Sequence, residues 1–181
     1  MTTAAEAAVL LRAEIDAVLA DWAYHLDHGQ LDELAALFTE DALFVTGAVE
    51  LQGRAQIKNR YLERTVVRST RHTYSGLRVG ALGSDREDVT ADAADGPGRP
   101  AAVRAWSTWV NYAANAAPPV EDVGVYLVAD FDDVLTWCAD ERWRISERRI
   151  IPVFRDIARG PITALPSPRF PAGPGHLAVT K

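Results

Sequence analysis

The chain has 181 residues, of which 48% are hydrophobic and 24% are charged. This length and composition are typical of one globular domain with a core large enough to enclose a pocket, and they exclude a wholly disordered protein. The formal net charge is -6, so phosphate backbones and anionic membrane surfaces would be repelled. We therefore expect no nucleic-acid partner and no membrane partner.

The single cysteine, Cys138, excludes an intrachain disulfide and a cysteine-based metal cluster. Asp21 and His25 have the spacing of one helical face, but two ligands do not make a site, and we predict no metal and no cofactor. The alanine-rich start is interrupted by charged residues, which is unlike an export signal, and no run of apolar residues is long enough to cross a membrane. These features predict a cytoplasmic protein.

The first third of the chain has the periodicity of helices. Apolar residues at steps of three and four predict a long helix over residues 4–28 and a short one over residues 31–38, separated by Gly29. A polar turn at residues 39–41 leads to a small hairpin of two β-prone runs, 42–45 and 49–51. A third helix, whose exposed side is basic, is predicted over residues 54–66.

Beyond residue 69 the hydrophobic period changes to two. Four strands are predicted over residues 70–79, 101–112, 123–137 and 143–154, with a long hairpin loop at 80–100. The proline-rich end is predicted to be an extended flap or a tail. We therefore predict an α+β fold with a domain over residues 1–155 and a flap or tail over residues 156–181.

A curled sheet with helices over its concave side leaves an apolar interior. The sequence has many aromatic residues suited to lining such a pocket for an apolar small molecule, or to filling the core. These residues are Tyr61, Tyr74, Trp106, Trp109, Tyr112, Tyr126 and Phe131.

His72 is the most suggestive titratable residue, because it alternates with Tyr74 along a predicted strand. A strand histidine is usually structural unless a carboxylate lies beside it, since a carboxylate fixes one imidazole tautomer and stabilises the protonated ring. Asp27 is the candidate carboxylate. Helical periodicity places it well away from the centre of the apolar stripe, so the pattern alone also fits a solvated helix end.

Several segments together resemble the SnoaL-like proteins of the nuclear transport factor 2 superfamily. The resemblance extends over about residues 10–155 and rests on segments 22–27, 31–34, 37–42, 71–79 and 143–148. It implies a cone-like, curved mixed β-sheet wrapped around helices, with the element order α-α-β-α-β-β-β-β.

Within that superfamily the chain is most similar to the branch of scytalone dehydratase and hexachlorocyclohexane dehydrochlorinase. This implies an acid–base dyad of Asp27 and His72 in a cofactor-independent lyase or isomerase, of dehydratase or cyclase type, acting on a hydrophobic small molecule of secondary metabolism. The strand around Trp106–Trp109 has no second histidine, which argues against scytalone as substrate. The candidate substrate-binding residues are Tyr24, Tyr61, Tyr74, Trp106, Trp109 and Arg148.

Two alternatives stay open within the same superfamily. The strand pattern around His72 and the final Trp-Arg-Ile strand also resemble the non-catalytic β subunit of aromatic-ring-hydroxylating dioxygenases. The third possibility is a small-molecule-binding protein without catalysis. In every case an apolar outer sheet face would require a partner, and we expect a homo-oligomer, a dimer or a trimer.

Overall fold

The structure, a computed structural model, describes residues 3–64, 66–82 and 99–162. Its α+β class is as predicted. The expected element order has one strand before the third helix, whereas the structure has two, β1 and β2, which pair as a hairpin. In chain order the elements are α1 (Ala4–Asp27), α2 (Leu31–Ala36), β1 (Phe38–Thr46), β2 (Val49–Gln52), α3 (Arg54–Leu62), β3 (Ser69–Ala81), β4 (Ala102–Ala114), β5 (Gly124–Trp137), β6 (Trp143–Arg155) and the short 3-10 helix η2 (Ile157–Arg159).

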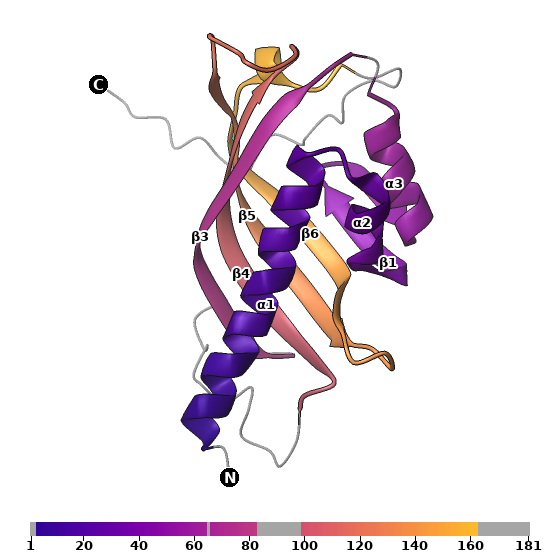
Figure 1. The fold of residues 1–181 in the computed structure, drawn as a ribbon, viewed down its shortest axis with the longest axis vertical. Helices are drawn as coiled ribbons and strands as arrows, with labels where there is room; N and C mark the ends of the chain where they lie inside the picture. Colours follow the sequence, from indigo (N-terminus) through magenta and orange to yellow (C-terminus); the bar gives the residue numbers. More distant parts are fainter. Residues whose placement is uncertain (1–2, 65, 83–98, 163–181) are drawn as a thin grey trace, which may run out of the picture.

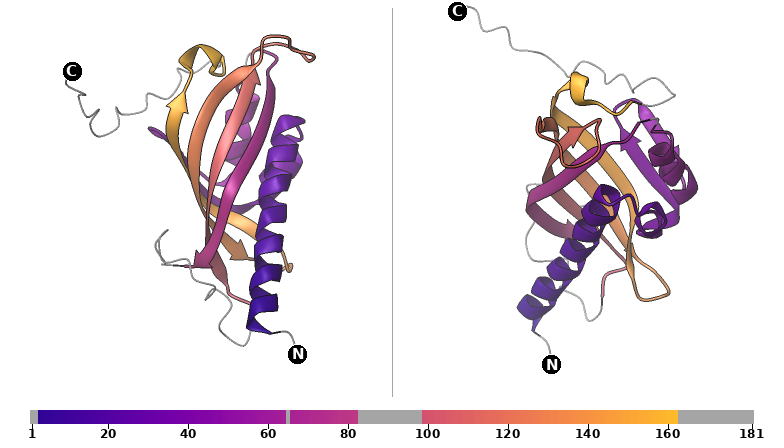
Figure 2. Two further views of the ribbon diagram at one scale, coloured as in Figure 1. Left: turned by 90° about the vertical axis from the view of Figure 1, so that its left-hand side faces the viewer. Right: turned by 45° about the horizontal axis from the view of Figure 1, so that its top comes forward.

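The strands form one six-stranded sheet in the order β2-β1-β6-β5-β4-β3. β1 pairs with β6 in parallel, and all other neighbouring strands are antiparallel, so the sheet is mixed. The sheet curves strongly, and α1, α2 and α3 lie on its concave side (Figures 1 and 2). This arrangement confirms the expected cone, open along one side, with the helices against its interior.

The long helix α1 supplies the largest part of the helical side of the core. It begins at a capping box between Thr3 and Glu6, which satisfies the first free backbone N–H groups. Burying each large apolar side chain contributes about 1.5–3 kcal/mol. The buried side chains of α1 are Leu11, Ile15, Leu19, Trp22, Ala23 and Leu26, a stripe that runs to the last turn of the helix.

Two local predictions are wrong. Residues 39–41, expected as a polar turn, belong to β1, where the pairing with β6 shifts between Phe38 and Leu43 so that an irregular strand carries the polar residues. The third helix ends at Leu62 instead of residue 66. Most of the expected loop at 80–100 and most of the expected flap at 156–181 fall outside the described residues.

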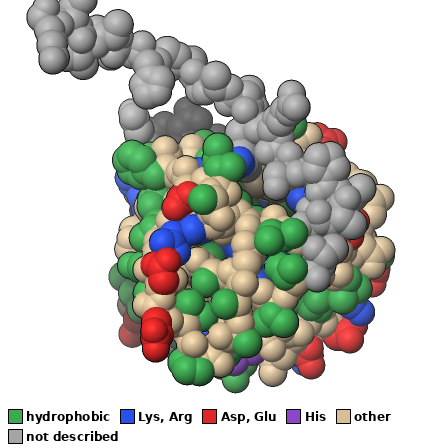
Figure 3. All heavy atoms as spheres, turned by 90° about the horizontal axis from the view of Figure 1, so that it is seen from above, with side chains coloured by type: hydrophobic (Ala, Val, Ile, Leu, Met, Phe, Trp, Pro, Cys, Tyr) green, Lys and Arg blue, Asp and Glu red, His purple; other side chains and the backbone are tan. Residues whose placement is uncertain are grey.

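The end of the molecule that carries η2 and the β4–β5 connection exposes many apolar side chains, which are seen from above in Figure 3. None of the described helices is long and apolar enough to span a membrane. β6 also exposes apolar side chains on the outer face of the sheet, where Ile151 and Val153 are each 52% exposed. Exposed apolar residues near the upper end include Val66, Val67, Val123, Ile157 and Ile162.

Gly53 joins the β1–β2 hairpin to α3 and fixes where that helix begins. Its φ of +89° and ψ of 146° lie in a region that L-residues rarely adopt, and a Cβ there would approach the Glu40 carbonyl oxygen at 3.1 Å. We predict that Gly53→Ala lowers the free energy of unfolding by about 1–3 kcal/mol, measured by urea denaturation.

Gly29→Ala is the matched control. Gly29 also has a positive φ, +70°, but a Cβ there would meet nothing within 4 Å. The control should therefore cost less than Gly53→Ala, since only the strain of the left-handed backbone applies. An equal or larger loss for Gly29→Ala would contradict this explanation of the α3 boundary.

Candidate active site

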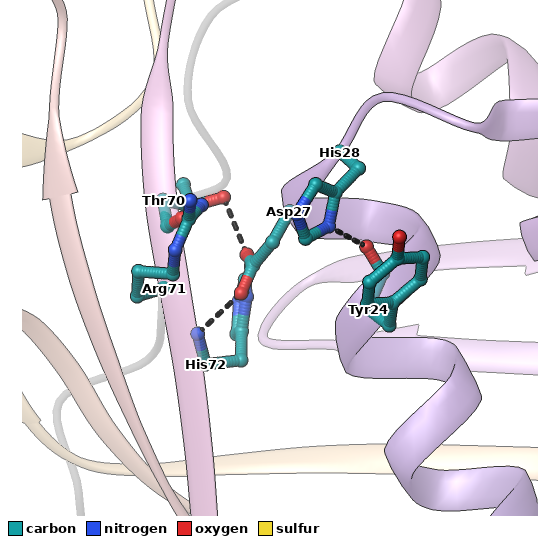
Figure 4. Close-up of polar contacts among 6 residues, drawn as sticks. All are labelled: Tyr24, Asp27, His28, Thr70, Arg71 and His72. Carbon is teal, nitrogen blue, oxygen red and sulfur yellow. Dashed lines mark hydrogen bonds and ion pairs between the residues drawn. The ribbon is translucent and has the colours of Figure 1, made fainter. Parts of the chain in front are cut away.

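Asp27 and His72 meet inside the cone. Asp27, the last residue of α1, accepts at its Oδ1 a hydrogen bond from His72 Nδ1 at 2.6 Å (Figure 4). The side chains of Asp27 and His72 are only 5% and 6% exposed, respectively. The Asp27 carboxylate also accepts the backbone N–H of His72 at 2.7 Å and the hydroxyl of Thr70 at 2.7 Å. The expected contact between the two residues is therefore confirmed.

Asp27 lies where a negative charge is electrostatically unfavourable, because the carboxyl end of a helix carries partial negative charge. A buried carboxylate there is tolerated only when donors surround it. Burial alone would raise the pKa of Asp27, but the hydrogen bonds and charge of His72 and the hydroxyl of Thr70 outweigh burial and lower that pKa. Asp27 is thus held as a carboxylate by strand β3.

The hydrogen bond also selects the tautomer of His72. An ionised carboxylate is an acceptor only, so Nδ1 carries the proton, and in the neutral form of the ring Nε2 keeps its lone pair. The ring is held in place by aromatic neighbours, with its centroid 5.4 Å from that of Trp22 and 6.5 Å from that of Trp109. His72 is therefore a fixed imidazole with one nitrogen left free for a proton.

Two adjacent hollows lie beside the dyad and share part of their lining. The inner cavity has a volume of about 140 Å³ and is lined by His72 with mostly apolar and aromatic residues, among them Trp22, Trp109 and Phe131. The larger mouth, about 600 Å³, lies between the end of α1, the start of β3 and the β4–β5 connection, and Asp27 and Thr70 line it. Three residues line both hollows: Leu26, Tyr61 and Arg64.

Beneath the cavity wall lies a second buried polar pair, Asp133 on β5 and Arg148 on β6. The register places the two residues opposite each other, and two hydrogen bonds of 2.7 and 2.8 Å join fully buried side chains. The guanidinium stands 4.3 Å from the Trp22 ring centroid. Burial raises the pKa of the Asp133 carboxyl, and the charge of Arg148 opposes that rise.

Of the predicted substrate-binding residues, Tyr61 and Trp109 line the inner cavity. Trp106 does not, because it is three residues from Trp109 and so faces the opposite side of β4, against Arg104. Tyr74 packs behind the cavity wall: its ring stacks on Trp109 at 4.5 Å, and its hydroxyl donates to Asp16.

Tyr24 and Arg148, which were also candidate substrate-binding residues, line neither hollow. Tyr24 lies on the outer side of α1, 54% exposed, and stacks on His28 at 4.1 Å. Arg148 lies inside the fold, but it is committed to Asp133 and is not among the residues that line either hollow. Of the candidate substrate-binding residues, four therefore line neither of these hollows: Tyr24, Tyr74, Trp106 and Arg148.

Sequence reasoning missed several residues of the site. Thr70 precedes His72 by two positions in the same strand, so strand alternation was a sufficient signal that both face Asp27. Arg60 and Arg64 belong to the basic face expected to be exposed, yet both line the inner cavity. Asn111 also lines it, opposite His72 in the β3–β4 register, which requires knowledge of the strand pairing.

Among the described ranges, no group of three or more His, Cys, Asp and Glu side chains is placed to hold a metal ion. His25, which was considered with Asp21 as a metal ligand, has its Nδ1 2.6 Å from Gln30 Oε1.

Comparison with known proteins places the fold in context. A family model described as a SnoaL-like domain matches residues 7–149. A search of curated proteins gives no match. Among solved structures, the chain is similar to a scytalone dehydratase-like protein from Novosphingobium aromaticivorans, with a TM-score of 0.65 and 19% identity over 93% of this chain and 97% of that one.

Two further structures are similar. One is a protein from Catenulispora acidiphila in complex with S-DNPA, with a TM-score of 0.61 and 24% identity over 80% of this chain and 94% of that one. The other is the β subunit of an aromatic-ring-hydroxylating-dioxygenase-like protein from Novosphingobium aromaticivorans, with a TM-score of 0.63 and 15% identity over 87% and 100% of the two chains. At these identities the likeness shows the fold.

The lowered pKa of Asp27 makes a prediction for stability. A carboxyl whose pKa is below its usual 3.8 in the folded state stabilises the protein above that pH, and the contribution disappears as the pH falls through the folded-state pKa. We expect Asp27→Asn to lower the free energy of unfolding by about 1–3 kcal/mol at pH 7. Urea denaturation from pH 7 to pH 3 should show this difference shrinking.

Asp21→Asn, an exposed carboxyl on the same helix, is the control and should change little at either pH. A difference between Asp27→Asn and the unmodified protein that stays constant down to pH 3 would show that Asp27 is not held as a stabilising carboxylate.

The buried pair Asp133–Arg148 predicts strong coupling. Removing one partner leaves an unpaired buried charge, so Asp133→Leu or Arg148→Met alone should cost about 3–5 kcal/mol of unfolding free energy. The double variant should cost less than either single variant, because apolar side chains then replace both charges. Urea denaturation of the three variants measures this, and additive losses would contradict the pairing.

Proposed function

Because the chain belongs to the SnoaL-like family, we propose that it is a cofactor-independent lyase or isomerase whose acid–base chemistry is performed by Asp27 and His72 on a hydrophobic small molecule. The observation that carries the proposal is the 2.6 Å contact between Asp27 Oδ1 and His72 Nδ1 at the edge of an apolar cavity. A structural histidine needs no cavity on its other side.

In the proposed reaction His72 Nε2 accepts a proton from a carbon atom next to a carbonyl group. The electron pair of the broken C–H bond forms a C=C bond while the π pair of the carbonyl moves onto its oxygen, which gives an enolate, and the Asp27 carboxylate stabilises the imidazolium through Nδ1. The carbonyl then re-forms as His72 returns the proton: to another carbon of the conjugated enolate in an isomerisation, or to the oxygen of a hydroxyl on the β-carbon, which leaves as water with its bonding pair, in a dehydration. A positioned base of this kind contributes about 10²–10⁴-fold to the rate.

The cavity walls supply the remaining requirement, a site from which water is excluded. Trp22, Trp109 and Phe131 pack edge to face or stacked, with ring centroids 4.8–5.7 Å apart. Charge interactions strengthen where water is absent, so the Asp27 carboxylate acts on the imidazolium more effectively there than at the surface. Rigid aromatic packing also holds the imidazole in one orientation.

The size of the two hollows supports a cyclic substrate. An inner cavity of about 140 Å³ is close to the roughly 150 Å³ of apolar cavities that hold one benzene ring. The mouth has room for a second ring or a side chain. The similar protein from Catenulispora acidiphila is in complex with a small molecule, S-DNPA, which supports a ligand-binding role for this cone.

Two alternatives remain testable with the purified chain. A dioxygenase β subunit would have no activity alone and would need its α subunit, and a pure binding protein would hold a ligand without converting it. Neither alternative requires an aspartate to order a histidine beside the cavity. The exposed Ile151 and Val153 on the outer face of the sheet support a homo-oligomer, which is compatible with all three functions.

Exchange of carbon-bound protons tests the proposed step without knowledge of the natural substrate. With 2-tetralone in D₂O, proton nuclear magnetic resonance should show exchange of the protons next to the carbonyl, faster than in buffer. We predict that His72→Ala lowers the protein-dependent exchange rate by about 10²–10⁴-fold, and Asp27→Asn by a comparable factor. The double variant should be hardly worse than the worse single variant, because base and positioning carboxylate act as a unit.

His25→Ala is the control, because this histidine bonds Gln30 and lines neither hollow. It should leave exchange unchanged. The proposal fails if His72→Ala retains the exchange rate of the unmodified protein while thermal denaturation shows both to be folded.

A further inference from the structure

Arginine side chains gather around the two adjacent hollows. Arg60, Arg64 and Arg155 line the inner cavity, and Arg64, Arg68 and Arg71 line the mouth. The chain as a whole has a net charge of -6, so this concentration of positive charge opposes the overall balance. Neither the proton transfer by His72 nor the packing of the aromatic wall uses these guanidinium groups.

Arg64 occupies the central position, because it is the one arginine that lines both hollows. Its guanidinium lies 5.1 Å from the centroid of the Tyr61 ring. No hydrogen bond or ion pair to an acidic side chain is found for it within the described part of the chain. Burial and the charge of Arg60 lower the pKa of Arg64, although the Tyr61 and Asp27 groups act in the opposite direction.

Arg68 stands beside it and is only partly satisfied. Nη1 donates to Asn115 Oδ1 at 2.8 Å, while Nη2 is buried and has no hydrogen-bond partner among the residues that the structure describes. The guanidinium lies 5.0 Å from the Tyr126 ring. Burial, followed by the repulsion from Arg64, lowers the pKa of Arg68 to about 10, so the group still carries its charge at neutral pH.

The other charges nearby do not neutralise these two groups. Arg60 is paired with Glu63 at 3.2 Å. Asp27 is the one carboxylate among the residues that line the mouth, and it already accepts bonds from His72 and Thr70. Two partly buried guanidinium groups against this single carboxylate leave an excess of positive charge at the junction, and a bound anion would offset the cost of that arrangement.

The geometry favours a carboxylate as that anion. A guanidinium presents a planar fork of N–H donors that matches the two oxygens of a carboxylate. Arg64 and Arg68 exceed the charge of Asp27 by one, which one carboxylate neutralises, while Arg71 at the mouth donates its Nη1 to the Thr70 carbonyl oxygen.

We propose that Arg64, assisted by Arg68, binds a carboxylate group of the substrate at the junction of the two hollows, so that the ring of the same molecule occupies the inner cavity beside His72. This inference rests on the proposed function and adds a substrate class to it: cyclic, largely apolar acids. Arg64 is then a specificity-determining residue, and it also fixes which end of the molecule enters first.

Isothermal titration calorimetry with two matched probes tests the inference by binding alone. 2-Naphthylacetate carries the carboxylate, and 2-naphthylacetamide is the neutral analogue of the same shape. We expect the acid to bind the unmodified protein about 10–100-fold more tightly than the amide, as charge-assisted hydrogen bonds predict. Arg64→Gln should remove that preference and leave the affinity for the amide unchanged. Arg64→Lys, which keeps the charge but not the fork, should give an intermediate preference.

Arg78→Gln is the control, because Arg78 is an exposed arginine of β3 that lines neither hollow. It should keep the full preference for the acid. Equal affinity of the unmodified protein for the two probes, or binding of neither, overturns the inference even if Arg64→Gln does not fold. Tighter binding of 2-naphthyl phosphate than of 2-naphthylacetate overturns the assignment to a carboxylate.

These outcomes are independent of the proposed chemistry. In His72→Ala both probes lose the contact of their ring with the imidazole, so both affinities can fall, but the acid should keep its preference over the amide because Arg64 recognises the carboxylate. Loss of the acid preference in Arg64→Gln, together with unchanged proton exchange in His72→Ala, would support the carboxylate site and reject the dyad. The reverse pair of results would support the dyad and reject the site.

Discussion

The site depends on a carboxylate placed where a helix least favours one. Asp27 ends α1, at the negative end of the helix dipole, and its side chain is 5% exposed. Only strand β3 makes this position acceptable, through the Thr70 hydroxyl and the backbone and ring N–H groups of His72. The ring bond that helps to satisfy the carboxylate also fixes the imidazole, so the contact of α1 with β3 is what assembles the site.

A second buried pair holds the opposite wall of the site. Arg148 bonds Asp133 and stands over Trp22, and the ring of Trp22 in turn meets the ring of His72 edge to face. Trp22 thus connects the two polar pairs. A well-packed interior transmits small displacements, so a change at Asp133 should move the imidazole even though the two residues do not touch. The aromatic wall therefore orients the base from one side while Asp27 orients it from the other.

The sequence was sufficient to predict the helices and strands, because the hydrophobic period distinguishes helix from strand over long segments. The strand boundaries of β4, β5 and β6 fall within two residues of the predicted ones. Periodicity placed Asp27 away from the apolar stripe of its helix, and only the resemblance to known proteins predicted its contact with His72. The reason is that β3 adds a contact surface to α1 that helical spacing alone does not reveal.

The pocket was harder to predict for the same physical reason. Which face of a strand a residue occupies follows from alternation, and Trp106 could have been separated from Trp109 on that ground. Whether an arginine is paired depends on the register of neighbouring strands, as the pairing of Arg148 with Asp133 shows. Arg64 and Arg68 follow α3, which ends at Leu62 where the helical pattern was expected to continue, and they line the inner cavity and the mouth.

The tautomer of His72 is the most direct measurement of the central interaction. Long-range proton–nitrogen correlation spectra of the ¹⁵N-labelled protein at neutral pH distinguish an imidazole protonated on Nδ1 from one protonated on Nε2. The account predicts that His72 carries its proton on Nδ1 and that Asp27→Asn abolishes the strongly downfield signal of that proton. A His72 ring protonated on Nε2, or a spectrum unchanged by Asp27→Asn, would contradict it.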